Sequence, residues 1–429
     1  MANLDTYTLL ISASVIIILS FLFGELSRKT NIPSVLMLIV LGILIQLGLA
    51  SQGIVEMDLL PILRAVGTVG LIMIVLEAAL ELELKREKVV PIIKALLVAL
   101  ISLLASAYAA VLILQAFLPD MENLTAWIYA TPISILSSAI IIPSVGGLSE
   151  AKKEFHIYES TFSDILGIMM FYFLSGLITN AEELQAGFGG FSINVVITLA
   201  LSFLVSYLLV LVFQNIRSHV KLFLLIAVLL LLYAVGKKFH LSSLIIILIF
   251  GLLISNMSVF FQGALKRWVD FKKADEIYEG LHVVTMETAF VVRTFFFVIF
   301  GLTISLASLL DGKVALISLA IIASIYAIRY VLLRIFLGKD ILPQLFIVPR
   351  GLVTVLLFYD IPDQAKSDSF SSGILLFVII VTSLIMTFAL IWEKRRTGKA
   401  VRQAQSNPVG LAPWKAPSVQ EPEAKEEAH

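Results

Sequence analysis

The sequence contains no cysteine and has few charged residues. Of its 429 residues, none is cysteine and only 14% are Asp, Glu, Lys or Arg. The absence of cysteine excludes disulfide bonds, zinc sites with cysteine ligands and thiol catalysis. The low charge, together with 59% hydrophobic residues and a mean hydropathy of +1.00, excludes a soluble globular protein of this size. The composition therefore predicts a protein that crosses a membrane many times.

Signals for several other classes are also missing. Residues 1–6 have no basic stretch before the first apolar run, so we expect this run to be a retained helix and not a cleaved signal peptide. The sequence has no Gly-x-Ser-x-Gly motif, no His and Glu residues at metal-binding spacing and no paired acids on one helix face. We also expect no nucleotide-binding domain in this sequence. We therefore predict that the chain is not an enzyme, uses no cofactor and does not bind nucleic acid.

The chain contains about thirteen apolar runs of about 17 to 25 residues, the length that crosses a bilayer as a helix. The predicted helices are 7–24, 33–50, 60–81, 90–117, 125–146, 157–178, 191–213, 220–236, 241–256, 281–307, 313–336, 343–360 and 371–393. About twenty basic residues lie in the odd-numbered connections and after the last helix, against about four in the even-numbered connections. Because basic residues mark the cytoplasmic side, we expect a cell (inner) membrane protein with its N-terminus outside and its C-terminus in the cytoplasm.

The composition changes near residue 397. Residues 1–396 are predicted to form the transmembrane domain, whereas 397–429 are polar and proline-containing and are predicted to be a disordered cytoplasmic tail. The basic residues Lys394–Arg396 precede this tail. We interpret them as an anchor that contacts anionic membrane lipid.

Two of the predicted helices are interrupted by proline. In the fifth, Pro143 removes a backbone donor and should free a carbonyl oxygen near Ala139. In the twelfth, Pro349 stands close to Gly351 in the middle of the span. The predicted topology makes these two helices run in opposite directions, which is typical of inverted repeats whose broken helices cross at the midplane. Ordinary kinks are the alternative.

The sixth predicted helix carries two acidic residues. Glu159 and Asp164 lie about 140° apart around the helix and about 7.5 Å apart along it, so we expect them to face different neighbours. Asp164 is the deeper residue, and we interpret it as a carboxylate that exchanges a proton for a cation. Hard cations prefer oxygen ligands, which Ser163, Ser137, Ser138 and the freed carbonyls of the fifth helix could supply. A structural salt bridge to an arginine is the alternative for Asp164.

Two arginines are predicted to be buried in the eleventh and twelfth helices. Arg329 and Arg350 cannot release their protons, so each needs an anion or a cage of carbonyl oxygens. Glu159 is the natural partner of Arg329, and their pair would hold the sixth helix against the eleventh. We expect Arg350 to support the converging ends of the broken helices, with substrate contact as the alternative.

Three further ionisable residues lie near the predicted cytoplasmic boundary. Arg293 is explained about equally well by snorkelling towards the headgroups and by a function. Glu77 is interpreted as part of an interfacial cap, or as a rim that attracts cations. His156 is interpreted as an ordinary interfacial histidine, with pH sensing as the alternative.

In order and position, these residues resemble the monovalent cation:proton antiporter superfamily, and within it the sodium/proton exchanger branch most closely. The motifs that carry the resemblance are the Glu-Ser-x-x-x-Asp run at 159–164, Arg329, Pro349–Gly351, Asn31–Pro33 and Leu76–Leu82. The resemblance implies a thirteen-helix homodimer. In it, a core bundle of about 90–178 and 313–393 moves against a dimerisation bundle of about 7–81 and 191–307.

The resemblance also implies roles for individual residues. Asp164 would bind cation and proton in competition, and Glu159 with Arg329 would be a bracing ion pair. Ser163 stands where this branch has asparagine, and Ser137-Ser138 stand where it has Thr-Asp or asparagine. These departures leave cation choice, affinity and stoichiometry open.

From these features we predict an electroneutral Na+/H+ antiporter that works by alternating access and serves pH homeostasis. Its partners would be Na+ (or K+ or Li+), H+, membrane lipid and a second copy of the chain. A K+/H+ antiporter on the same scaffold is the nearest alternative. An ion channel or a membrane sensor that does not transport is an alternative of another class.

Overall fold

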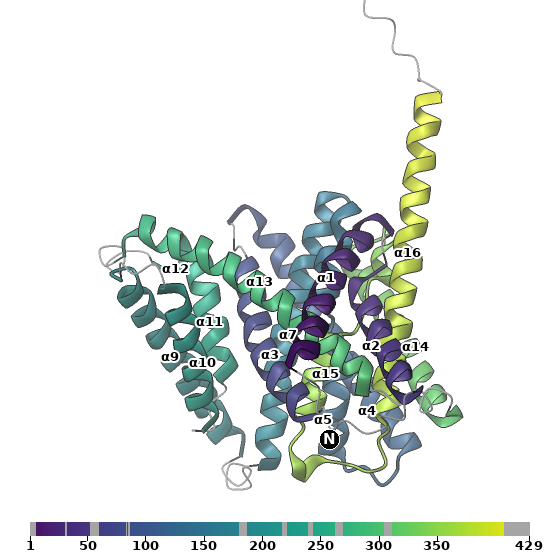
Figure 1. Cartoon of the computed structure of the whole chain (residues 1–429), viewed down its shortest axis with the longest axis horizontal. Helices are drawn as coiled ribbons and strands as arrows, with labels where there is room; N and C mark the ends of the chain where they lie inside the picture. The colour runs from purple at the N-terminus through teal and green to yellow at the C-terminus, as the bar shows by residue number, and fades with distance from the viewer. Residues whose placement is uncertain are drawn as a thin grey trace, which may run out of the picture.

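The structure is a computed structural model that describes residues 6–30, 32–51, 60–82, 84, 86–179, 187–216, 221–238, 243–261, 269–303 and 311–406. Every regular element in these residues is helical (Figure 1). The helices are α1 Thr6–Thr30, α2 Ser34–Ser51, α3 Leu60–Glu81, α4 Val89–Phe117, α5 Asn123–Ser134, α6 Ser138–Ser144, α7 Glu150–Thr179, α9 Gly187–Phe213, α10 Lys221–Lys238, α11 Ser243–Ser255, α12 Met257–Phe260, α13 Phe271–Thr303, α14 Gly312–Phe336, α15 Leu352–Tyr359 and α16 Ser372–Ser406.

All thirteen predicted spans are found as helices, and two of them are broken. The fifth span consists of α5 and α6, and the twelfth consists of an extended stretch followed by α15. Eight segments of the described chain are long and apolar enough to cross a membrane, and three shorter apolar helices accompany them. The predicted all-helical, many-span fold is therefore confirmed.

Three predicted boundaries were wrong. Helix α7 begins at Glu150 and not at 157, and α13 begins at Phe271 and not at 281, because both helices continue through polar residues past the apolar run. Helix α16 runs to Ser406, past the predicted start of the disordered tail at 397. The rest of that tail, 407–429, lies outside the described residues.

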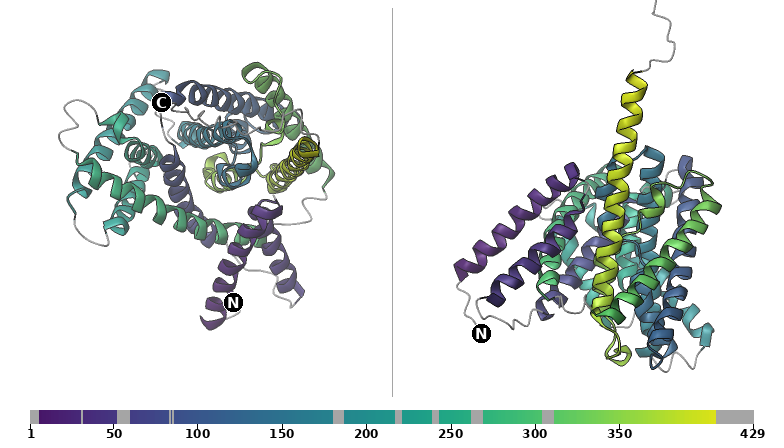
Figure 2. Two further views of the ribbon diagram at one scale, coloured as in Figure 1. Left: turned by 90° about the horizontal axis from the view of Figure 1, so that it is seen from above. Right: turned by 90° about the vertical axis from the view of Figure 1, so that its right-hand side faces the viewer.

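The helices pack into two groups. In the first, here called the core bundle, α4 packs against α5, α7 and α14, while α15 packs against α5 and α16 against α14. In the second, the scaffold bundle, α13 packs against α2 and α3, and α11 packs against α3, α9 and α10. Helix α3 joins the two bundles through contacts with α7 and α15. Figure 2 shows these groups side by side, with the C-terminal part of α16 extending beyond the other helices.

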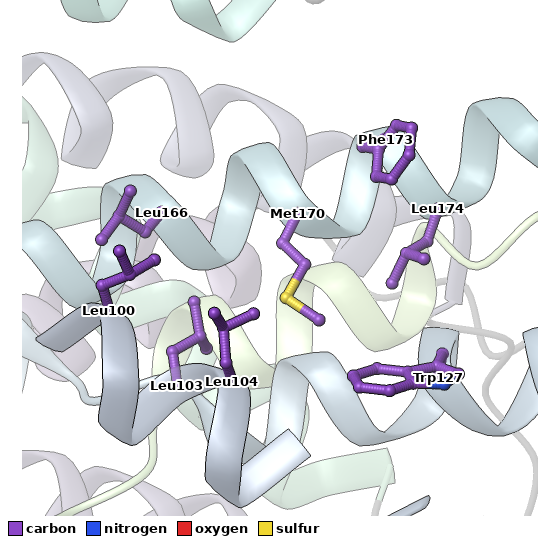
Figure 3. A pocket seen from close by; sticks show the side chains of 8 residues that line it. All are labelled: Leu100, Leu103, Leu104, Trp127, Leu166, Met170, Phe173 and Leu174. Carbon is purple, nitrogen blue, oxygen red and sulfur yellow. The ribbon is translucent and has the colours of Figure 1, made fainter. Parts of the chain in front are cut away.

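One face of the core bundle carries an apolar groove. It has a volume of about 360 Å³ and lies between α4, α5 and α7, where Leu103, Trp127 and Met170 are among its lining residues (Figure 3). No acidic or basic side chain lines it. This face of α7 therefore suits contact with lipid.

Candidate ion-binding site at the crossing of two broken helices

The first break is an extended segment, Ile135–Ser137, between α5 and α6. We expected the break near Ala139, one turn before Pro143, and this was wrong. Pro143 lies inside α6, near the end of that short helix, and Ala139 is helical. The break lies earlier because the backbone N–H groups of Leu136, Ser137 and Ser138 find partners outside their own helix.

Helix α7 supplies two of these partners. The backbone N–H of Leu136 donates to Ser163 Oγ at 3.0 Å, and the backbone N–H of Ser138 donates to Asp164 Oδ2 at 3.2 Å. Buried backbone donors inside a membrane protein must be paired, so these two side chains stabilise the extended conformation. Ser163 therefore uses its oxygen on the backbone of the broken helix.

The second broken helix supplies another partner. The backbone N–H of Ser137 donates to the carbonyl oxygen of Pro349 at 3.0 Å. Arg350, which is 1% exposed, donates from Nε to the carbonyl oxygen of Ile133 at 2.7 Å. A Cβ atom at Gly351 would lie 2.5 Å from Ser137 Oγ, so only glycine permits this approach. The two breaks thus cross in direct contact, and Arg350 bonds to the backbone carbonyl of Ile133 across the crossing.

Asp164 lies beside this crossing. Its side chain is 3% exposed, and its Oδ2 accepts hydrogen bonds from both the backbone N–H and the hydroxyl group of Ser138. Its other oxygen, Oδ1, is buried without a hydrogen-bond partner. Within the described part of the chain, no basic side chain forms an ion pair with Asp164. The structure therefore shows a buried carboxylate with one oxygen held and one oxygen free.

Of the three serines expected to be cation ligands, one contacts Asp164. Ser138 does so through its hydroxyl group. The hydroxyl oxygen of Ser163 instead accepts a hydrogen bond from the backbone N–H of Leu136, and Ser137 Oγ is buried without a hydrogen-bond partner. The carbonyl oxygens of Ile135 and Leu136 accept no hydrogen bond from any other described residue. The oxygen atoms available to bind a hard cation are therefore Asp164 Oδ1, Ser137 Oγ and the carbonyl oxygens of Ile135 and Leu136.

Glu159 faces a different neighbour. Arg329 of α14 donates from Nη1 to Glu159 Oε1 at 2.6 Å and from Nη2 to Oε2 at 3.0 Å. Its Nε donates to the carbonyl oxygen of Gln344 at 3.1 Å. The two charged side chains are 0% and 1% exposed. The charge of Glu159 is therefore neutralised by a fixed, bidentate partner, unlike that of Asp164.

His156 is not the interfacial residue we expected. It is fully buried, and its Nδ1 lies 3.3 Å from Glu159 Oε2. Because α7 begins at Glu150, His156 sits well inside the helix and on the side that faces the ion pair. The predicted span began at 157, one residue after His156, so the sequence placed this histidine outside the helix.

Arg293 and Glu77, which we interpreted separately as boundary residues, form an ion pair with each other. Arg293 Nη2 of α13 lies 3.0 Å from Glu77 Oε1 of α3, and the two side chains are 19% and 13% exposed. Opposite charges inside two apolar runs were the available signal for this pair. Nothing in the sequence indicated that these two helices are neighbours.

Known proteins resemble this chain in both sequence and fold. The family model for the transmembrane part of sodium/hydrogen exchangers matches residues 14–393. The structure of the sodium proton antiporter MjNhaP1 from Methanocaldococcus jannaschii at pH 8 is similar, with a TM-score of 0.64 and 19% identity, covering 91% of this chain and 99% of that one. An electron-microscopy structure of the same antiporter has a TM-score of 0.61 and 17% sequence identity, covering 96% of this chain and 100% of that one. A comparison with curated protein sequences gave no match.

The match covers nearly the whole membrane part of the chain. It confirms the resemblance inferred from the sequence, the multi-pass membrane character and the expectation of a transporter in place of an enzyme. The chain belongs to the sodium/hydrogen exchanger family.

Proposed function

We propose that the protein exchanges Na+ for H+ in an electroneutral cycle and that Asp164 binds the two ions in competition. The observation that carries this proposal is the state of the Asp164 carboxylate. It is buried beside the crossing of the broken helices, its Oδ2 is held by Ser138, and its Oδ1 has no hydrogen-bond partner. A buried carboxylate without a fixed counter-ion is stable only with a proton or a bound cation.

The proposed stoichiometry rests on the number of acids that remain available. Glu159 is bound by Arg329 through two hydrogen bonds, so its charge is not free to exchange ions. Ser138 stands beside Asp164 where the related branch carries a second polar or acidic ligand, and a hydroxyl group adds no charge. One carboxylate holds one proton or one monovalent cation at a time, so each turnover moves equal charge in both directions.

We also infer the arrangement in the membrane. Alternating access would come from movement of the core bundle, which carries Asp164, against the scaffold bundle, which would carry the interface of a homodimer. The excess of basic residues in the odd-numbered connections and after the last span supports an N-terminus outside and a C-terminus in the cytoplasm of the inner membrane. In this setting the exchanger would serve pH homeostasis.

The test is transport in liposomes that contain the purified protein and a pH-sensitive dye. A pulse of Na+ should move protons out of the lumen, and Li+ and K+ in place of Na+ report selectivity. Asp164→Asn should abolish this signal, because the amide binds neither ion. Asp363→Asn removes an exposed acid outside the spans and should leave the signal intact.

Each outcome bears on a separate part of the proposal. Full activity of Asp164→Asn would exclude this residue as the site. A response to K+ but not to Na+ would favour K+/H+ exchange on the same scaffold. A steady current across the membrane would contradict electroneutral exchange and indicate a channel.

A further inference from the structure

A narrow apolar cavity lies next to the site, between the two bundles. It is formed by α7 of the core bundle with α3 and α11 of the scaffold bundle, and Ile168, Met169, Val75 and Leu248 are among its lining residues. Along α7 it begins directly after Asp164 and extends away from Glu150, towards the end of the molecule where α7 ends and α16 begins. This end is called the outer end below. The cavity has room for about one water molecule, so it admits no hydrated cation.

Tyr172 closes this cavity at its outer end. Its hydroxyl group donates to Asp360 Oδ2 at 2.6 Å, and Asp360 directly follows α15 in the core bundle. The same hydroxyl group is also within hydrogen-bonding reach of Tyr233 of α10, in the scaffold bundle. Because Tyr172 uses its proton on Asp360, its oxygen is left to accept from Tyr233. The two tyrosines therefore join the core bundle to the scaffold bundle.

We propose that Tyr172, Asp360 and Tyr233 form the outer gate of the ion path. This inference rests on the proposed function, because a gate is needed only if Asp164 exchanges ions with both sides in turn. Asp360 fixes the direction of the Tyr172 hydroxyl, and Tyr233 provides the contact that has to break. When that bond breaks and the bundles separate, water and cations reach Asp164 through the widened cavity.

The absence of cysteine in the chain makes a direct test possible. A single cysteine introduced as Val75→Cys reports on the cavity, since valine and cysteine are similar in size. A cationic thiol reagent that does not cross membranes is applied to sealed vesicles, and the rate of modification is measured. Ser369→Cys serves as a reference, because this residue lies in the exposed loop between α15 and α16 at the outer end. Its modification shows that the reagent has access to the outer-end side.

Tyr233→Phe should raise the rate at Val75→Cys about tenfold from the outer-end side, because one hydrogen bond across the bundles is lost. Tyr172→Phe, which loses both bonds, should raise it at least as much. The matched control Tyr330→Phe removes a hydroxyl group from an exposed tyrosine of α14 and should leave the rate unchanged. The Ser369→Cys rate should be the same in every background.

Unchanged rates at Val75→Cys in both Tyr172→Phe and Tyr233→Phe would overturn the gate. So would a rise only when the reagent is on the opposite side. The labelling does not depend on transport of any particular ion. If the wild-type protein fails to exchange Na+ for H+ while Tyr233→Phe still opens the cavity, the proposed function is wrong and the gate stands.

Discussion

Replacing Arg329 by alanine should destabilise the protein more than the loss of either of two more exposed ion pairs. Arg329 gives Glu159 two hydrogen bonds at 2.6 and 3.0 Å, and both side chains are essentially inaccessible to solvent. Without the guanidinium group, a buried carboxylate remains with no cation beside it. The cost of breaking a buried pair in this way is about 3 to 5 kcal/mol.

The assay is a heat series in detergent, read as the fraction of protein that remains monodisperse on size-exclusion chromatography. Unfolding of membrane proteins in such a series is irreversible, so only midpoints measured under identical heating are compared. Using about 2 °C per kcal/mol, Arg329→Ala should lower the midpoint by roughly 6 to 10 °C. Arg293→Ala, which breaks the partly exposed pair with Glu77, should lower it less, and Lys366→Ala, which breaks an exposed pair, should barely change it.

A double variant separates the contribution of the ion pair to stability from the cost of leaving one buried charge unpaired. With Glu159→Met and Arg329→Met together, neither charge of this pair is left, and the side-chain volumes remain similar. The midpoint should therefore recover most of the loss seen in Arg329→Ala. A midpoint for Arg329→Ala equal to that of Lys366→Ala would refute the reasoning, as would a double variant no more stable than the single one.

Two further predictions concern glycines at the broken helices. Gly351→Ala places a Cβ atom 2.5 Å from Ser137 Oγ, so transport in liposomes should be lost even where folded protein is recovered; wild-type transport would contradict the close crossing. Gly167→Ala places a Cβ atom 2.3 Å from Ile135 Cγ1 and should reduce the yield of monodisperse protein, and Ile135→Ala in the same chain should restore it. A yield unaffected by Gly167→Ala, or not restored by the second change, would show that the extended segment does not pack there.

The sequence predicted the helices and the separation of the two acids on α7. Helix geometry alone placed Glu159 and Asp164 on different faces, and the structure puts Arg329 beside one and Ser138 beside the other. These predictions succeeded because hydropathy and the helical repeat are local properties of the chain. The role of Ser163 could not be read in the same way, because a hydroxyl group that bonds to a distant backbone N–H looks like any other helical serine.

The position of the first break shows the same limit. Pro143 was the visible signal, since proline removes a donor from its own helix. The break occurs instead at Ile135–Ser137, where α7 and the second broken helix satisfy the backbone donors. Contacts between distant segments decided where the helix ends, and one sequence carries no direct record of such contacts. The pair formed by Arg293 and Glu77 escaped prediction for the same reason.

In the exchange we propose, the hydrogen bonds of Asp164 would let a single acid couple two ions. Ser138 bonds to Oδ2 only, so a proton or a cation on the Oδ1 side leaves the broken helix in place. The empty carboxylate is the one form that carries an uncompensated charge past the apolar side chains of Ile168 and Met169. A penalty of several kcal/mol for that form suppresses uncoupled movement of the core bundle by about a thousandfold or more. Under this proposal, coupling would follow from the cost of an unpaired charge at Asp164 and would need no second titrating residue.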